Sequence, residues 1–155
     1  MPGKQLTPMD EANAFLQEQI KRREQMLIQI AFYTGEAGLI VARMNGNYTD
    51  RTGNLRSSTG YVVVQNGRVL QISDFQQVPP KKKKKGDKYD GGKEGEKFAK
   101  KILNKFMKGI AIIEVAGMNY SGYLSAKGYD VLDSAEDEVK RVFLQLLKAK
   151  GFILK

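Results

Sequence analysis

Apolar positions repeat at helical spacing along the first third of the chain, and they predict one long N-terminal helix. The repeating positions are Leu16, Ile20, Leu27, Ile30 and Ala31. Thr7 is placed to cap the helix, Pro8 suits its first position, and the pattern continues to Met44. A helix of about 36 residues would span about 54 Å. Gly35 and Gly38 are the positions at which it would bend or divide. Residues 28–44 are apolar around most of the helix, so we expect cover from several sides, including from another subunit.

Two further helices are predicted in the second half of the chain. One begins near Lys93, carries Phe98, Ile102, Leu103 and Phe106 on one face, and stops before Gly109. The other is capped by Asp133 or Ser134 and ends at Gly151. Its apolar positions are Ala135, Val139, Val142, Phe143, Leu146 and Leu147. The segment Phe152–Leu154 is then expected to dock as a short edge strand.

Three segments are predicted to be β-strands. Residues 61–65 and 68–73 flank Asn66-Gly67, the dipeptide best suited to a two-residue hairpin turn. The third strand is the apolar, β-branched run from Ile110 to Ala116. Strands mixed with helices predict one α+β domain over residues 1–155, with residues 1–45 as its N-terminal helical segment. The expected sheet is an antiparallel hairpin plus a central strand, flanked by helices.

The segment 76–96 interrupts these patterns. It contains two prolines, five consecutive lysines and several glycines, so little of it can be buried. Like charges repel and glycine disfavours order, which predicts a flexible, exposed basic loop inserted into the domain. A loop of about 20 residues inside a small domain is usually functional or disordered.

The composition argues against most enzyme classes. The 155 residues include no cysteine and no histidine, which removes disulfides, thiolate or imidazole metal ligands and the usual general base. The serines at 57, 58 and 121 therefore have no histidine to activate them. Acidic residues gather at 130, 133 and 136–138, where helix capping explains them better than a cation site does. We therefore predict no catalytic, cofactor or metal site and no enzymatic activity. The N-terminus has no apolar signal core, and no apolar run approaches 18 residues, so no membrane association is expected.

The positive charge is concentrated in one segment. The chain carries a net charge of +9, and residues 81–108 alone contain twelve lysines and four acids. The candidate contact residues are Lys81, Lys82, Lys83, Lys84, Lys85 and Lys88. They could neutralise nucleic-acid phosphates without reading sequence, contact an acidic protein surface, or act only as a solubilising loop. Tyr89 is the only aromatic residue near the run, so stacking on single strands is not indicated.

Two short motifs resemble a known family. Thr52-Gly53-Asn54-Leu55-Arg56-Ser57-Ser58 precedes the hairpin, and Val115-Ala116-Gly117-Met118-Asn119-Tyr120-Ser121-Gly122-Tyr123-Leu124 spans the end of the third strand and the segment after it. Together they are similar to the neck and tail-completion proteins of long-tailed bacteriophages, also known as minor tail components. That family has a Thr-Gly-x-Leu-Arg-x-Ser turn, a hairpin, a variable segment, a strand ending in Asn-x-Tyr-Ala-x-Tyr-Val-Glu, and often a C-terminal helix. The order matches over residues 52–147. Ser125 replaces the expected glutamate, and residues 128–132 enter the last helix without the family's Pro-Phe-Leu.

The resemblance implies a curved antiparallel sheet and a non-enzymatic virion protein at the head–tail junction. Such a protein would assemble in the host cytoplasm into a six- or twelve-fold ring around the DNA channel. Its partners would be the connector or adaptor, the tail-tube or terminator proteins, and packaged DNA in the lumen. It also implies structural roles for Thr52, Gly53, Leu55, Arg56, Tyr120, Tyr123 and Gly128. In this interpretation the two tyrosines brace the crossing after the third strand, and Gly128 releases the chain into the last helix. The alternative is a sequence-independent nucleic-acid-binding protein that acts through the Lys81–Lys85 loop.

Overall fold

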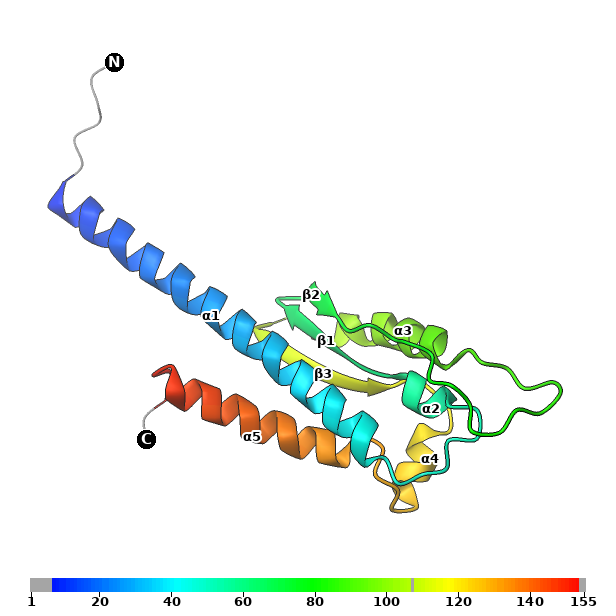
Figure 1. The fold of residues 1–155 in the computed structure, drawn as a ribbon. Helices are drawn as coiled ribbons and strands as arrows, with labels where there is room; N and C mark the ends of the chain where they lie inside the picture. Colours follow the sequence, from blue (N-terminus) through cyan, green and yellow to red (C-terminus); the bar gives the residue numbers. More distant parts are fainter. Residues whose placement is uncertain (1–6, 107, 154–155) are drawn as a thin grey trace.

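The computed structural model describes residues 7–106 and 108–153, which form an α+β domain (Figure 1). The main helices are α1 (Pro8–Asn45), α3 (Gly91–Ile102) and α5 (Asp133–Ala149). Two short helices, α2 (Asn54–Ser57) and α4 (Ser121–Ala126), flank the sheet ends, and a 3-10 turn, η1 (Leu103–Lys105), follows α3. The strands are β1 (Thr59–Gln65), β2 (Arg68–Ile72) and β3 (Ile110–Ala116).

The long helix α1 confirms the prediction made from its apolar stripe. Thr7 and Asp10 form a reciprocal capping box, in which the Thr7 hydroxyl accepts from the Asp10 amide at 3.2 Å. The helix is not divided at Gly35 or Gly38. These glycines instead allow close packing: a Cβ at Gly35 would lie 2.5 Å from the Tyr61 ring.

The hairpin is confirmed, but the sheet order places the third strand differently. Asn66 and Gly67 both have positive φ, 49° and 78°, as a two-residue turn of this kind requires. All pairs are antiparallel and the strand order is β2-β1-β3. The central strand is therefore β1, and β3, expected to be central, lies at an edge. Residues 61–64 of β1 are fully buried because β1 has a strand on each side and helices pack on both faces of the sheet.

Helices cover both faces of the sheet. On one face, Val62, Val64, Ile113 and Val115 pack against Ala99 of α3 and its neighbours. On the other face, Tyr61 and Val63 pack against Ala31 and Leu39 of α1. Helix α5 lies along α1 on this second side (Figure 1). The resulting layers are α3, sheet, and the α1/α5 pair.

Several predicted helix details are wrong. α3 begins at Gly91 rather than Lys93, because its two N-terminal glycines pack tightly against Asn54 and Phe75. Phe98, predicted on the same helical face as Ile102 and Leu103, is 39% exposed, and Ala99 takes the buried position. α5 is capped by neither Asp133 nor Ser134; the carboxylate of Asp130 accepts from the Ser134 amide at 3.1 Å.

The predicted end of α5 is confirmed, but the strand beyond it is not. Gly151 has φ 72°, and the Phe152 amide donates to the Leu147 carbonyl, as in a left-handed helix cap. Phe152 and Ile153 then form a bend rather than an edge strand, with the Phe152 ring under Arg23 of α1. Leu154 lies outside the described residues.

The N-terminal half of α1 extends beyond the sheet and α5 (Figure 1). Its apolar side chains are uncovered: Phe15, Leu16 and Ile20 are 56–60% exposed. By length and composition alone, α1 could cross a membrane. This was not predicted from the sequence, because no uninterrupted apolar run approaches 18 residues. A core helix meets the same criterion, and the buried residues of α1 all lie between Ile30 and Ala42.

Candidate functional site

The turn around Gly53 is fixed by the backbone conformation of Gly53 and by hydrogen bonds from Ser57. Gly53 has φ 75°, and a Cβ there would lie 2.5 Å from the Val78 carbonyl oxygen, so glycine is required on two grounds. The Gly53 carbonyl accepts hydrogen bonds from the Ser57 amide at 2.9 Å and the Ser57 hydroxyl at 2.6 Å. Thr52 contributes a weak contact, in which its hydroxyl accepts from the Asn54 amide. Leu55 is buried.

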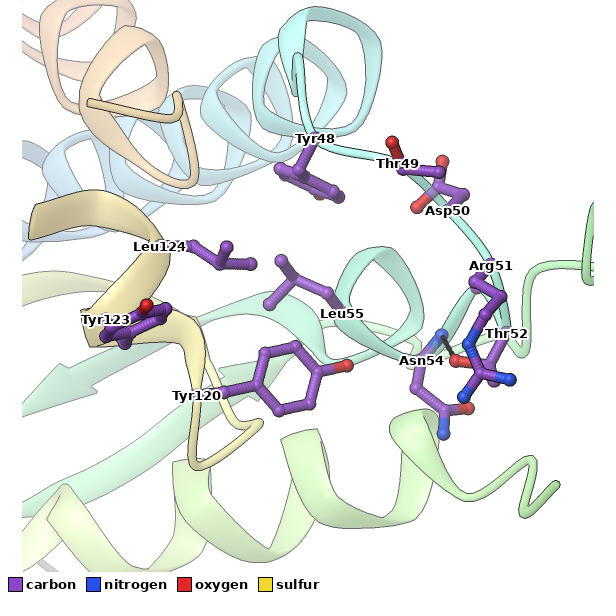
Figure 2. A pocket seen from close by; sticks show the side chains of 11 residues that line it. Tyr48, Thr49, Asp50, Arg51, Thr52, Asn54, Leu55, Tyr120, Tyr123 and Leu124 are labelled. Carbon is purple, nitrogen blue, oxygen red and sulfur yellow. Dashed lines mark hydrogen bonds between the residues drawn. The ribbon is translucent and has the colours of Figure 1, made fainter. Parts of the chain in front are cut away.

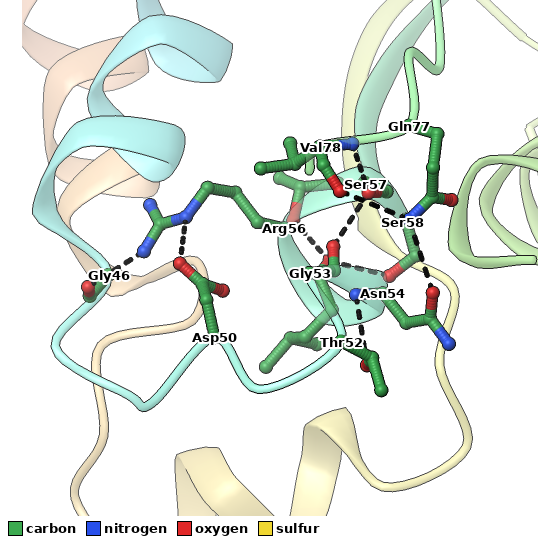
Figure 3. A network of polar contacts seen from close by, with 12 residues as sticks. Gly46, Asp50, Thr52, Gly53, Asn54, Arg56, Ser57, Ser58, Gln77 and Val78 are labelled. Carbon is green, nitrogen blue, oxygen red and sulfur yellow. Dashed lines mark hydrogen bonds and ion pairs between the residues drawn. The ribbon is translucent and has the colours of Figure 1, made fainter. Parts of the chain in front are cut away.

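Arg56 anchors this turn to the end of α1 (Figure 3). Its Nε donates to Asp50 Oδ2 at 2.7 Å, and one Nη donates to the Gly46 carbonyl at 3.1 Å. The guanidinium also lies over the Tyr48 ring, 5.0 Å from its centre. The Arg56 and Asp50 side chains are only 15% and 7% exposed, so the pair is held in a mostly dry environment.

The two motifs of the sequence meet through Ser58. Its hydroxyl donates to the Leu55 carbonyl at 2.7 Å and accepts from the Met118 amide at 3.3 Å. Its carbonyl accepts from the Gly117 amide at 3.1 Å. The turn before β1 is therefore hydrogen-bonded to the segment after β3, about 60 residues further along the chain. This contact joins the motifs into one structural unit.

A cavity of about 400 Å³ lies between the two motifs (Figure 2). Its walls come from residues 48–55 and from Tyr120, Tyr123 and Leu124. Tyr120 lies beside Leu55 and directs its hydroxyl toward the Asn54 side of the cavity (Figure 2). Burial raises the pKa of both Tyr48 and Tyr120, so neither phenol is prepared to act as a base near neutral pH. The cavity lies where the turn that follows α1 packs against α4.

Tyr123 lies in α4, and Gly128 lies just after its end. Tyr123 is 60% exposed, and its ring receives the Lys127 ammonium at 4.6 Å from its centre. Gly128 has φ 84° and ends α4 before the chain turns toward α5. α4 itself is tied to β3 because the Ser121 hydroxyl donates to the Ala116 carbonyl at 3.1 Å.

The lysine loop is attached to the same turn. Asp87 accepts from Arg51 at 2.8 Å, and the side-chain amide of Asn54 donates to the Lys88 carbonyl at 2.8 Å. Asp87 also accepts from the Lys84 amide at 3.0 Å, which closes a tight turn after the lysine run. The hydrogen bonds from the Arg51 side chain and from the Lys84 backbone amide hold the pKa of Asp87 below its usual value. All of the candidate contact residues, Lys81–Lys85 and Lys88, are exposed.

The acidic residues near α5 form capping and ion-pair contacts. Glu136 pairs with Lys140 and Glu138 with Arg141, while Asp130 caps the helix. In the described part of the chain, no group of three or more acidic side chains is arranged to hold a metal ion.

Sequence reasoning missed one acid whose carboxyl oxygens are buried. Glu114, within the apolar run of β3, lies against α1 and α5, and neither carboxylate oxygen has a hydrogen-bond partner in the described residues. Burial, reinforced by nearby Glu36, raises the pKa of Glu114 to about 8. The lone acid in an otherwise apolar strand was the available signal. It also missed the lysines of α3, whose spacing of three and four residues predicts one helical face.

Comparison with known proteins supplies no relative: no family model, no curated protein and no solved structure matches the chain.

Proposed function

We propose that this chain is a subunit of the neck or tail-completion ring of a long-tailed bacteriophage, a non-enzymatic protein at the head–tail junction of the virion. The observation that carries the proposal is the contact between the two motifs that resemble this family. The Ser58 hydroxyl and carbonyl bind the Met118 and Gly117 amides, so the motifs form one joint between β1, β3 and α4. Residues that act together in a fold are better evidence of relationship than two isolated motifs.

Uncovered surfaces support a ring subunit. Leu16 and Ile20 lie on the same face of α1 that further along packs on the sheet, yet they are 56% and 59% exposed. An apolar stripe continued beyond its own core is typical of a surface that a partner covers. Both β2 and β3 pair on one side only within the described sheet. Head-to-tail contacts between subunits would cover such surfaces and close a ring.

The proposed partners follow from that position. The subunit would associate with itself in six- or twelve-fold symmetry, with connector or adaptor proteins on one side and tail-tube or terminator proteins on the other. Assembly would take place in the host cytoplasm.

The test is the assembly state of the purified protein, measured by light scattering after size exclusion and by negative-stain electron microscopy. We expect rings, formed either alone or with the candidate connector and tail proteins. Replacing Leu16 and Ile20 by glutamate should prevent assembly. The matched control adds the same charges on the opposite face of α1, as Ala14→Glu and Gln25→Glu, and should assemble normally. Monomers under all conditions, with and without partners, would refute the proposal.

A second candidate function is sequence-independent nucleic-acid binding by the free protein through Lys81–Lys85. The exposure of all five lysines on a loop that Arg51 and Asn54 attach to the domain favours it. It predicts duplex binding that weakens steeply with salt. Unchanged affinity after replacing the five lysines by serine would eliminate it.

A further inference from the structure

The tertiary structure separates the charges of this protein by layer. Residues 81–108, which contain the loop and α3, carry twelve lysines and four acids. Helix α1 carries five acids and four basic residues, and α5 carries four acids and three basic residues. Neither helix of the α1/α5 layer therefore has a net positive charge, and most of the excess lies in α3 and in the loop that precedes it.

Within that side, α3 presents a row of lysines to solvent. Its positions that face the rest of the domain are small and buried: Gly91, Gly92, Gly95 and Ala99. Lys93, Lys97 and Lys100 repeat on the opposite face, with Lys101 beside them, and all four are exposed. From Lys93 to Lys100 the row covers about 10 Å of helix.

This arrangement is unfavourable for the isolated protein. Like charges three or four residues apart destabilise a helix by about 0.2–0.5 kcal/mol per pair. Among the described residues of α3, one ion pair, Glu96–Lys100, offsets the repulsion. On α5, by contrast, two ion pairs, Glu136–Lys140 and Glu138–Arg141, link acids to basic residues four and three positions further along. Less of the positive charge is therefore paired on α3, where one of four lysines has a partner, than on α5.

We propose that the outer face of α3, together with the Lys81–Lys85 loop, is a contact surface for the phosphate backbone of duplex DNA. Among the described lysines of the loop and of α3, only Lys100 has an ion-pair partner, and ammonium groups without such partners suit a surface of repeated negative charge. Tyr89 is the only aromatic residue between Lys81 and Lys97, so base stacking contributes little and the contact is independent of sequence. A linear row on a straight helix favours a regular duplex, whose phosphates lie along a continuous backbone.

The inference rests on the proposed function for the presence of DNA, since a neck ring encloses the channel through which DNA passes. It adds an orientation to that function. The α3 side of each subunit would face the lumen, and the exposed stripe of α1, in the opposite layer, would remain available for contacts between subunits.

Binding of the full-length protein to a fluorescein-labelled 30-base-pair duplex of arbitrary sequence, measured by anisotropy at several salt concentrations, tests the proposal. The variant replaces Lys93, Lys97 and Lys101 by glutamine and keeps Lys100, which pairs with Glu96. The matched control removes three exposed lysines of the other layer, as Lys21→Gln, Lys148→Gln and Lys150→Gln, so both proteins have the same net charge.

We expect the α3 variant to lose about tenfold or more in affinity at low salt, and its slope of log K against log salt to fall by about 2.7. The control should bind within about twofold of the wild type. The α3 variant should stay folded by circular dichroism, because removing like charges relieves repulsion. Equal binding by variant and control would overturn the proposal, as would a wild-type protein that ignores the duplex but binds polyglutamate.

The ring and DNA hypotheses fail separately in these experiments. Rings that assemble without binding DNA would overturn the inference and leave the proposed function intact. DNA binding that depends on the α3 row, in a protein that never forms rings, would support the contact surface and contradict the neck assignment.

Discussion

The carboxyl group of Glu114 on β3 faces Gly38 of α1 at a distance that leaves no room for a side chain. A Cβ at Gly38 would lie 2.6 Å from Glu114 Oε1 and 2.5 Å from a methyl group of Val139. The contact brings α1, α5 and the sheet together around one buried acid. It therefore links the packing of three elements to the protonation of a single side chain.

The first prediction is that stability falls as pH rises from about 4.5 to 8. The pKa of Glu114 is raised from 4.5 to about 8, mainly by burial and also by Glu36. Over this range the folded protein keeps a proton that the unfolded chain loses, so the contribution is complete below pH 4.5 and is lost on rising through 8. The full change is on the order of 5 kcal/mol. Urea unfolding at a series of pH values measures it. Glu114→Gln should remove this part of the pH dependence of the free energy of unfolding. If the free energy of unfolding changed with pH equally in the two proteins, the assignment to Glu114 would be contradicted.

The second prediction concerns Gly38→Ala. In an exposed helix, alanine in place of glycine stabilises by up to about 1 kcal/mol. At Gly38 the added methyl would overlap Val139 and Glu114, so we expect a net loss of about 1–3 kcal/mol in the free energy of unfolding. Gly122→Ala is the control, because a Cβ there meets nothing within 4 Å. Thermal unfolding followed by circular dichroism measures the effect. Gly38→Ala should have a lower melting temperature than the wild type, and Gly122→Ala should not.

The third prediction is strong coupling between Arg56 and Asp50. Truncating Arg56 to alanine would leave the Asp50 carboxylate buried without its partner, at a cost of about 3–5 kcal/mol. Asp50→Ala would leave the guanidinium unpaired in the same way. A double-mutant cycle in urea should show that the double variant loses clearly less than the sum of the single losses. Additive losses would mean that the ion pair does not stabilise the turn.

The fourth prediction separates the two tyrosines of the second motif. Tyr120 lines the cavity beside Leu55, so Tyr120→Ala should cost about 1–2 kcal/mol and impair ring assembly. Tyr123 is 60% exposed, and Tyr123→Ala should change stability by less than about 0.5 kcal/mol. Chemical unfolding and particle counts in electron micrographs measure the two effects. A fully stable Tyr120→Ala protein that assembles normally would contradict its role as a brace.

Local patterns were sufficient for most of the secondary structure. Asn66-Gly67 specified the hairpin because both residues tolerate positive φ, and Thr7-Pro8 with Asp10 specified the start of α1. The exposed lysine loop also followed from composition. The start of α3 was misplaced because its first glycines are fixed by contact with Asn54 and Phe75, which local propensity does not contain.

The sequence by itself determined which segments are helices and strands, the candidate motifs and the excess of positive charge. Only the tertiary structure decided that β1 is central, that Ser58 joins the two motifs, that Glu114 is buried beside Gly38, and that the lysines of α3 face away from α1 and α5. The physical reason is the range of the interactions. Turn geometry, capping and periodicity act within a few residues, whereas burial and the neighbours of a charge depend on contacts between segments far apart in the chain.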